Sequence, residues 1–194
     1  QVKNLRAFGV PVVVAVNRFD ADTEAELALI EEVCAGIEVE AVVCTHWADG
    51  SAGAEALART VVALVESAPS KFRFLYPDDM ALWDKARTIA RTMYGARDII
   101  ADQKTRDQFA EFEKAGYGHY PICMAKTQYS LSTDPTLKGA PSDHVVPIRE
   151  LRLAGGAEFL VAICGEVMTM PGLPRVPAAT NISVDAEGRI TGLF

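Results

Sequence analysis

An unbroken apolar run at residues 11–16, rich in β-branched valine, dominates the start of the chain. A run without polar alternation is typical of a central strand of a parallel sheet that is covered on both faces. Apolar residues then recur at helical spacing over residues 23–35, and Thr23 followed by Glu26 matches a capping box. A second apolar run at residues 39–45 completes a predicted strand, capped helix and strand.

The pattern continues with a glycine-containing loop at residues 46–53, a helix at residues 54–67 and a strand at residues 72–76. Alternation of strands and helices is the pattern of right-handed crossovers in a parallel sheet. We therefore predict an α/β fold in which about residues 9–76 form a three-layer Rossmann-like parallel sheet. The loops after the first two strands leave the same edge of that sheet, where ligands bind in open α/β folds.

The remaining residues, 77–194, are predicted to form a mixed α+β portion packed on the βαβαβ unit of residues 1–76, the two together making one continuous domain. One helix is expected at residues 81–95 after a cap at Asp78 or Asp79. The other expected elements are a helix at residues 105–115, strands at residues 144–153 and 159–164, a hairpin over residues 182–190 that turns at residues 185–188, and irregular segments at residues 125–141 and 168–177.

Composition and charge narrow the classes of function. Of the 194 residues, 49% are hydrophobic and 23% are charged, which is ordinary for a globular protein. The net charge of −7 and the pI near 5.0 argue against binding to nucleic acid or anionic membranes, because phosphate contacts need clustered Lys and Arg. No apolar run approaches the roughly 20 residues that span a bilayer. We expect a cytoplasmic protein with no nucleic-acid or membrane partner.

The spacing of the cysteines and histidines along the sequence predicts no metal site. The four cysteines form no C-x-x-C pair and are expected to be small buried hydrophobic residues. The three histidines lack metal-ligand spacing and are expected to have surface or packing roles. These residues are Cys34, Cys44, Cys123, Cys164, His46, His119 and His144.

The four residues after the first strand, Asn17-Arg18-Phe19-Asp20, have the form of the N-[KR]-x-D signal that reads guanine in GTP-binding proteins. A guanine site also needs a phosphate loop of the G-x-x-x-x-G-K-[ST] type, and these residues contain none. A GTP-binding domain is therefore the weakest of the functional hypotheses.

Two aromatic residues, Phe19 and Trp47, each follow a predicted strand directly and lie in a polar loop. Such an aromatic either packs into the core or is a stacking platform for a flat ligand, and the residues alone leave both interpretations open. If the two strands are neighbours, the rings face each other across one crevice. The role of Lys126 is left open in the same way. A lysine in a loop of hydroxyls and amides either binds phosphate or carboxylate or is simply solvated.

Six stretches, in the same order and spread over nearly the whole chain, resemble the carboxyl-terminal part of formate–tetrahydrofolate ligase, also called 10-formyltetrahydrofolate synthetase. They are FGVPVVVAVNRF (residues 8–19), THWADG (45–50), YGA (94–96), PICMAKTQYSLS (121–132), MPGLP (170–174) and GLF (192–194). The CMAKTQYSLS and MPGLP stretches are too long for chance agreement.

The resemblance implies a ligase that joins formate to the N10 of tetrahydrofolate at the expense of ATP, with Mg²⁺, through formyl phosphate. The family's glycine-rich phosphate loop lies in an amino-terminal part that these residues do not include. We therefore expect the chain to be the folate-side portion of the ligase, inactive alone, with that ATP-binding part as its partner. We also expect a homo-oligomer and no cofactor requirement for folding. The alternative is a free-standing folate-binding or subunit-interface module without catalysis.

By the same resemblance, Phe19 and Trp47 match two aromatics that sandwich the pterin ring, and Val43 matches an apolar wall residue of that pocket. Asn17 and Arg18 belong to the same loop, and the resemblance gives them no firm role.

A second family motif, Lys126-Thr127-Gln128, either orders the pocket or approaches the nucleotide. The chain departs from the family pattern in three places. Ser51 stands where a glycine is usual and is expected to be strained if it needs a positive φ, and Glu158 stands where a small residue is usual. His119-Tyr120 replaces a more apolar pair before Pro121.

Overall fold

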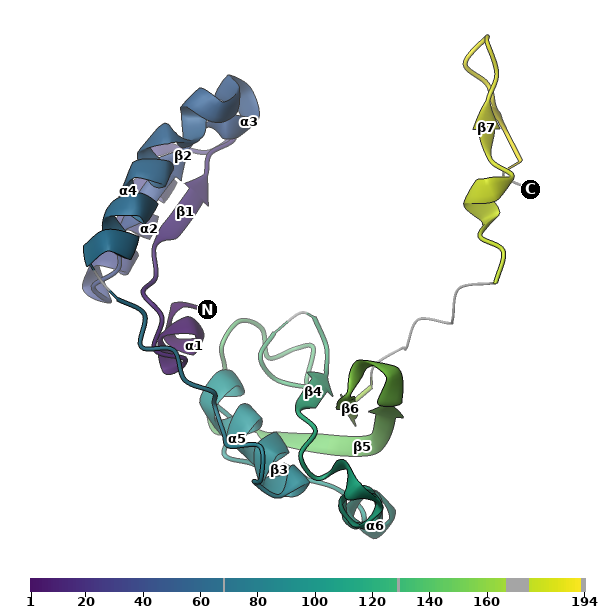
Figure 1. The fold of residues 1–194 in the computed structure, drawn as a ribbon. Helices are drawn as coiled ribbons and strands as arrows, with labels where there is room; N and C mark the ends of the chain where they lie inside the picture. Colours follow the sequence, from purple (N-terminus) through teal and green to yellow (C-terminus); the bar gives the residue numbers. More distant parts are fainter. Residues whose placement is uncertain (68, 129, 167–174, 193–194) are drawn as a thin grey trace.

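Figure 1 shows the computed structural model of the chain, which describes residues 1–67, 69–128, 130–166 and 175–192. The protein is a mixed α/β structure. A first unit, residues 2–67, contains a two-stranded parallel sheet, and a second unit, residues 82–164, contains a four-stranded mixed sheet. A two-stranded antiparallel hairpin follows near the carboxyl end. Within these ranges, no helix combines the length and apolar character that crossing a membrane requires.

The first unit confirms the predicted strand, helix, strand and helix. Its elements are α1 (Val2–Ala7), β1 (Val14–Asn17), α2 (Glu24–Gly36), β2 (Ala41–Cys44), α3 (His46–Asp49), a 3₁₀ turn (Gly50–Ala54) and α4 (Glu55–Ser67). β1 and β2 run parallel, with Val14 opposite Ala41 and Asn17 opposite Cys44. The carboxyl ends of both strands therefore lie at the same edge of the sheet.

The predicted capping box begins α2. The hydroxyl of Thr23 accepts a hydrogen bond from the Glu26 N–H at 3.3 Å, and the Glu26 carboxylate accepts one from the Thr23 N–H at 2.9 Å. The bond from the Thr23 backbone holds the pKa of Glu26 below its ordinary value of 4.5. Two N–H donors at the helix start are thus satisfied by local residues alone.

The first unit has a small core. Its buried hydrophobic residues are Val16, Leu27, Cys34, Val39 and Cys44, and α4 has no buried residue although its apolar residues recur at helical spacing. The side chains of Val61 and Val65 on α4 are 40% and 71% exposed. The apolar side of α4 is therefore largely open.

The second unit holds the main hydrophobic core. Its elements are α5 (Leu82–Tyr94), β3 (Asp98–Ile100), α6 (Gln103–Phe112), a π-helical turn (Glu113–Tyr117), β4 (Ile122–Ala125), β5 (Val145–Ala154), a 3₁₀ turn (Gly155–Ala157) and β6 (Phe159–Cys164). The strand order is β3-β5-β6-β4, with β5 and β6 antiparallel and the outer pairs parallel. Leu82, Phe109, Val146 and Leu160 join the helices to this sheet in one buried cluster.

Lys85 of α5 is fully buried. Its ammonium donates hydrogen bonds to the backbone oxygens of Asp78, Gly118 and Tyr120 at 2.6, 2.8 and 3.1 Å. Burial lowers the pKa of Lys85, but three carbonyl acceptors can be satisfied only by the protonated amine with its three N–H donors. The buried cation therefore ties together the turn before α5 and the segment that leads into β4.

The prediction of a strand at residues 72–76 is wrong. The Lys71 and Arg73 N–H groups donate to the oxygens of Gly9 and Phe8 at 3.0 and 2.9 Å, but no strand forms. The apolar alternation instead reflects aromatic packing, because the Phe72 ring stacks on Phe8 at 6.3 Å and meets Phe74 edge-on at 5.2 Å. The predicted βαβαβ unit therefore lacks its third strand.

The starts of α5 and α6 differ from the prediction. Neither Asp78 nor Asp79 caps α5. Its N-cap is Ala81, and the Leu82 N–H donates instead to the Glu113 carboxylate at 2.6 Å. The predicted helix at residues 105–115 begins two residues earlier.

The loop predicted at residues 46–53 contains α3 and the first part of the 3₁₀ turn. In that turn Gly50 has the positive φ, of 62°, and Ser51 does not, so the strain expected at Ser51 is absent. Glu158 does take a left-handed conformation, with φ of 57°.

The predicted carboxyl-terminal hairpin is confirmed as β7 (Ser183–Val184) and β8 (Ile190–Thr191), after a 3₁₀ turn (Ala178–Thr180). Most of the irregular segment predicted at residues 168–177, with the MPGLP stretch, lies outside the described residues. Three cysteines are buried as expected, but Cys123 is exposed because alternate side chains of β4 point away from the core.

Candidate ligand site at the strand ends

Phe19 lies in the loop between β1 and α2, and this loop is fixed by short-range hydrogen bonds. The Phe19 N–H donates to the Asp22 carboxylate at 2.7 Å, and the Asp22 N–H donates back to the Phe19 oxygen at 3.0 Å. The capping box at Thr23 then holds the next residue. The Phe19 backbone is therefore ordered even though its side chain is 47% exposed.

Trp47 lies in α3, directly after β2, and its turn depends on a glycine. The Thr45 N–H donates to the Gly53 oxygen at 3.0 Å, so the chain closes on itself around α3. A Cβ atom at Gly53 would lie 2.5 Å from the backbone nitrogen of His46, which is too close for any side chain. Gly53 thus permits the backbone approach that places Trp47, whose side chain is 67% exposed.

The two aromatic rings meet, as the sequence predicts. The centroids of Phe19 and Trp47 are 6.0 Å apart, and the ring planes are inclined by 59°. Large exposed aromatic side chains that converge at the ends of neighbouring parallel strands are suited to stacking on a flat ligand.

The rings are too close in this conformation to enclose a ligand. A flat heterocycle needs about 3.5 Å to each ring plane, so two parallel rings around it would be about 7 Å apart. The observed pair is closer, at 6.0 Å, and tilted. A ligand must therefore separate the rings by about 1 Å and turn them towards parallel. We expect Trp47 to make more of this movement, because the Phe19 backbone is held by Asp22.

The other predicted site residues of the first unit lie around this pair. Val43 is half-buried on β2 opposite Val16, and Asn17 is exposed at the end of β1. The Arg18 guanidinium forms an ion pair with Glu24 at 2.5 Å. Its charge is therefore already partnered across the loop.

Lys126 lies at the end of β4, in the second unit. Its ammonium donates to the backbone oxygens of Thr127, at 3.0 Å, and of Ser130, and it lies 5.1 Å from the centroid of the Tyr94 ring. Burial lowers the pKa of Lys126. Thr127 is half-buried, whereas Gln128 is exposed. These contacts are internal to the loop and to α5.

The structure does not bring all predicted site residues together. Phe19, Trp47, Val43, Asn17 and Arg18 gather at one edge of the first unit. Figure 1 shows that the loop after β4, which carries Lys126, Thr127 and Gln128, lies in the other unit, far from α3. That loop borders a separate polar cavity of about 300 Å³.

Sequence reasoning missed two residues that shape the site. Asp22 could have been found, because Asp side chains commonly bond to backbone groups three or four residues earlier in the chain. Gly53 carried no readable signal, since its role depends on a close contact with the backbone of His46 that only the fold reveals.

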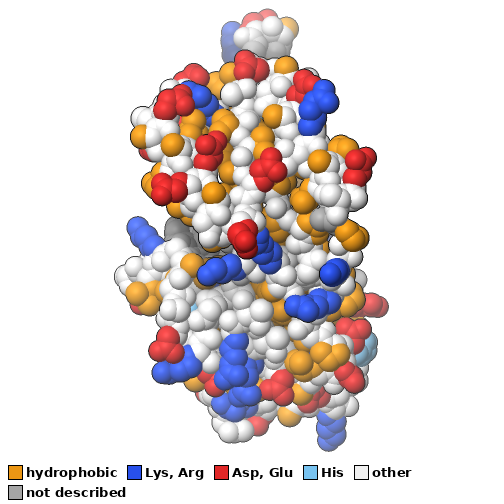
Figure 2. Space-filling model, turned by 90° about the vertical axis from the view of Figure 1, so that its left-hand side faces the viewer, with side chains coloured by type: hydrophobic (Ala, Val, Ile, Leu, Met, Phe, Trp, Pro, Cys, Tyr) orange, Lys and Arg blue, Asp and Glu red, His pale blue; other side chains and the backbone are white. Residues whose placement is uncertain are grey.

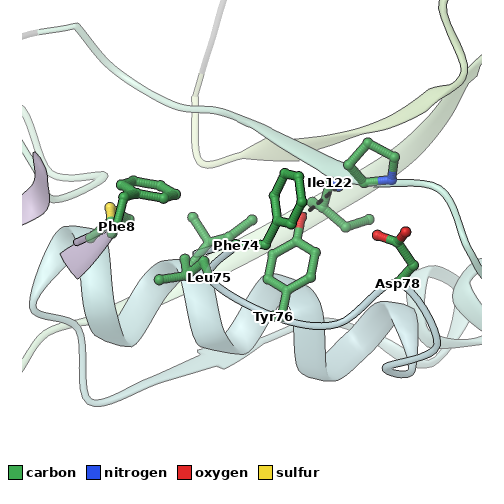
Figure 3. A pocket seen from close by; sticks show the side chains of 9 residues that line it. Phe8, Phe74, Leu75, Tyr76, Asp78 and Ile122 are labelled. Carbon is green, nitrogen blue, oxygen red and sulfur yellow. Dashed lines mark hydrogen bonds between the residues drawn. The ribbon is translucent and has the colours of Figure 1, made fainter. Parts of the chain in front are cut away.

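A second cavity, of about 370 Å³, lies where the first unit meets α5. Figure 3 shows Phe74, Leu75 and Tyr76 on one side of it and Ile122 near the Tyr76 hydroxyl, which accepts the Ile122 N–H at 3.2 Å. The lining is mostly apolar, with Asp78 at one end (Figure 3). It lies outside the aromatic pair and holds no predicted site residue.

Charge is unevenly distributed over the molecule. On the face in Figure 2, Asp and Glu side chains are spread over the upper part, which holds α2 and α4, while most Lys and Arg side chains lie below it. Within the ranges that the structure describes, no group of three or more His, Cys, Asp or Glu side chains could hold a metal ion. His46 and His119 are exposed, and His144 is half-buried.

Comparison with known proteins identifies the family. A family model described as formate–tetrahydrofolate ligase matches residues 1–194. Formate–tetrahydrofolate ligases of Methylobacterium nodulans and Granulibacter bethesdensis are 61% and 58% identical to the chain and match all of it, over 35% and 34% of their own lengths. The ligase of Methylobacterium radiotolerans is 60% identical, again over the whole chain and 35% of its own length. The chain, which spans about a third of the length of these curated relatives, belongs to the formate–tetrahydrofolate ligase family.

Proposed function

We propose that these 194 residues form the folate-side portion of an ATP-dependent ligase that joins formate to tetrahydrofolate, to give 10-formyltetrahydrofolate, through formyl phosphate. The observation that carries the proposal is the exposed pair of Phe19 and Trp47 at the ends of two parallel strands, in a chain of this family. Since the chain spans about a third of its relatives, we assign formate activation to the other part of the enzyme.

The residues of this chain do not fit ATP or Mg²⁺. The sequence has no phosphate loop, and its described parts contain no cluster of metal ligands. Phosphoryl transfer needs backbone N–H groups and positive charge around the phosphates, together with a metal ion. The role that we assign to this chain is therefore to bind and orient tetrahydrofolate.

In this proposal the pterin ring enters between the Phe19 and Trp47 rings and replaces their mutual contact. Each aromatic face contributes about 0.5–1.5 kcal/mol beyond burial. Val43 forms an apolar wall beneath, while Asn17 and Arg18 shape the loop. Stacking fixes the plane of the pterin, and orientation of the reacting nitrogen is what a binding portion can add to the reaction.

For the Lys126-Thr127-Gln128 motif we propose an ordering role. Lys126 directs hydrogen bonds to oxygens of its own loop and lies on the Tyr94 ring, so its ammonium holds the loop against α5. Because this loop lies in the other unit, far from α3, the ordering that we propose concerns the motif's own loop rather than the aromatic pair.

We also propose that residues 1–76 belong to a three-layer Rossmann-like sheet in the whole enzyme, with residues 77–194 packed on them in one continuous domain. A hydrogen bond of 2.9 Å from the Asn4 side chain to the Met93 oxygen, which joins α1 to α5, supports the packing. The homo-oligomer and the cytoplasmic location stay predictions.

Titration of tetrahydrofolate, followed by tryptophan fluorescence, tests the proposal. Trp83 packs edge-on against Phe109 in the core, so Trp83→Phe leaves Trp47 as the single reporter. We expect binding to change the Trp47 emission and Phe19→Ala to weaken binding about 2- to 12-fold, the equivalent of one lost stacking contact. Phe72→Ala, at an exposed aromatic outside the pair, is the matched control. Equal affinity of Phe19→Ala and Phe72→Ala would refute the assignment.

A further inference from the structure

The apolar cavity of about 370 Å³ between the first unit and α5 has no part in the proposed function. Distant parts of the chain build its walls, namely Phe8 after α1, residues 74–78 before α5, Ile89 and Met93 of α5, and residues 121–122 before β4. Pockets for small organic molecules have a volume in this range and are mostly apolar, with a few polar groups. The cavity therefore has the size and the lining of a ligand site.

The Tyr76 wall of the cavity is already in place without a ligand. The Tyr76 hydroxyl accepts the Ile122 N–H at 3.2 Å (Figure 3), and Ile122 is buried at the start of β4. The ammonium of the buried Lys85 lies 5.7 Å from the centroid of the same ring. The Tyr76 ring is therefore held between a strand and a helix.

The Phe74 wall, in contrast, is largely in water. Its side chain is 77% exposed, the highest value among the large hydrophobic residues in the described ranges. It meets Phe72 edge-on at 5.2 Å, and Phe72 is exposed as well. Covering an apolar ligand would remove this aromatic surface from water, which is favourable. Phe74 is therefore suited to close over a bound molecule.

The charge at one end of the cavity is negative. Figure 3 shows the Asp78 carboxylate there, and within the described ranges this carboxylate forms no ion pair. The buried ammonium of Lys85 bonds to the Asp78 backbone oxygen and interacts with three carboxylates, those of Asp78, Asp79 and Glu113, so acidic groups are in excess. A carboxylate beside aromatic faces attracts an organic cation, both by its charge and by the negative faces of the rings.

We propose that this cavity binds a small organic cation, with an apolar or aromatic body between Phe74 and Tyr76 and a protonated amine at Asp78. Tetrahydrofolate and formate are anions, which Asp78 would repel, so this site is distinct from the aromatic pair and does not depend on the proposed function. A ligand here contacts the first unit, the segment before α5 and α5 itself, so binding would also stabilise the arrangement of the two units.

Titration with 2-phenylethylamine, 2-phenylethanol and 3-phenylpropionate tests the proposal, because these probes share a ring and differ in charge. The Ile122 amide, bonded to the Tyr76 wall, is the reporter in two-dimensional NMR, and the Val43 amide on β2 is the internal control. We expect the amine to shift the Ile122 amide with a Kd on the order of 1 mM, the alcohol to bind about 3- to 10-fold more weakly, and the propionate to bind more weakly still. Equal affinity of the amine and the alcohol, or no saturable shift with the amine, would overturn the proposal.

Two variants separate the charge of the site from its shape. Asp78→Asn should weaken binding of the amine about 2- to 5-fold and leave binding of the alcohol unchanged. Phe74→Ala should weaken binding of both probes by about 2-fold or more. Asp107→Asn removes the same charge from an exposed position on α6 and is the matched control. Equal affinity of Asp78→Asn and Asp107→Asn for the amine would contradict the assignment of Asp78.

Other occupants of the cavity would give different results. A second copy of the chain would shift the Ile122 amide with protein concentration when no probe is present. A segment of the rest of the ligase would fill the cavity in a full-length chimera, in which this chain replaces the matching third of the Methylobacterium nodulans ligase, and saturation transfer to the amine would be lost there. Either result would overturn the proposal, whereas transfer that persists in the chimera and weakens with Asp78→Asn supports it.

The outcomes of this test and of the tetrahydrofolate titration are independent. None of the measurements with the phenyl probes uses tetrahydrofolate or depends on Trp47. A failed tetrahydrofolate titration with intact binding of the amine therefore refutes only the proposed function, and the reverse outcome refutes only the cation site.

Discussion

Replacement of Lys85 by methionine should destabilise the protein strongly. Methionine keeps most of the apolar stem but removes the ammonium, which leaves the oxygens of Asp78, Gly118 and Tyr120 without this donor. A buried acceptor that loses its partner costs about 1–3 kcal/mol. Three such losses are partly offset by the removed cost of burying a charge and by partial relaxation, so we expect a net loss of about 3 kcal/mol.

That loss is measurable as a shift of the melting temperature followed by circular dichroism. For a chain of this size, 1 kcal/mol corresponds to about 2–4 °C, so Lys85→Met should melt about 6–12 °C lower. Lys104→Met removes the same charge from an exposed position on α6 and should change stability by no more than about 0.5 kcal/mol. A shift below about 2 °C for Lys85→Met would refute the reasoning, because it would mean that the three carbonyls find other donors at no cost.

Three further predictions follow from local geometry. Burial raises the pKa of Cys164 to about 12, whereas Cys123 is exposed, so a thiol reagent should modify Cys123 rapidly in the folded protein, and Cys123→Ser should abolish the rapid phase. Glu158→Gly should raise the free energy of unfolding in urea by about 0.5–1 kcal/mol, since glycine accepts the left-handed conformation, while Glu158→Ala should give no gain. The lowered pKa of Glu26 means that the capping box is intact above its ordinary value of 4.5 and is lost as pH falls through the lower folded value. The amide resonance of Thr23 should therefore titrate below pH 4.5, and Glu26→Gln should remove that titration.

Local interactions explain what could be predicted from the sequence. The capping box of α2 and the turn of the β7–β8 hairpin each involve residues within a few positions of one another. The meeting of Phe19 and Trp47 was also predictable, because parallel strands that are adjacent must end at the same edge.

Long-range contacts explain what could not be predicted from the sequence. The aromatic alternation at residues 72–76 looks like a strand, but packing against Phe8 uses the same alternation without a hydrogen-bonded partner. Glu113 caps α5 from 31 positions away, so no local signal marks that helix start. Lys85 reads as an ordinary surface lysine of an amphipathic helix, and only the fold brings three carbonyl groups around it.

The distribution of the core affects the stability of the candidate site. Most buried hydrophobic residues lie in the second unit, whereas Phe19 and Trp47 are carried by the first unit, which has few. Regions with few buried contacts open at lower free energy than the rest of a protein. The loop at Phe19 continues directly from β1, so a ligand that orders this loop also stabilises the strand. In the proposed function, binding of tetrahydrofolate should therefore stabilise the first unit more than the second, because the first unit carries the aromatic pair.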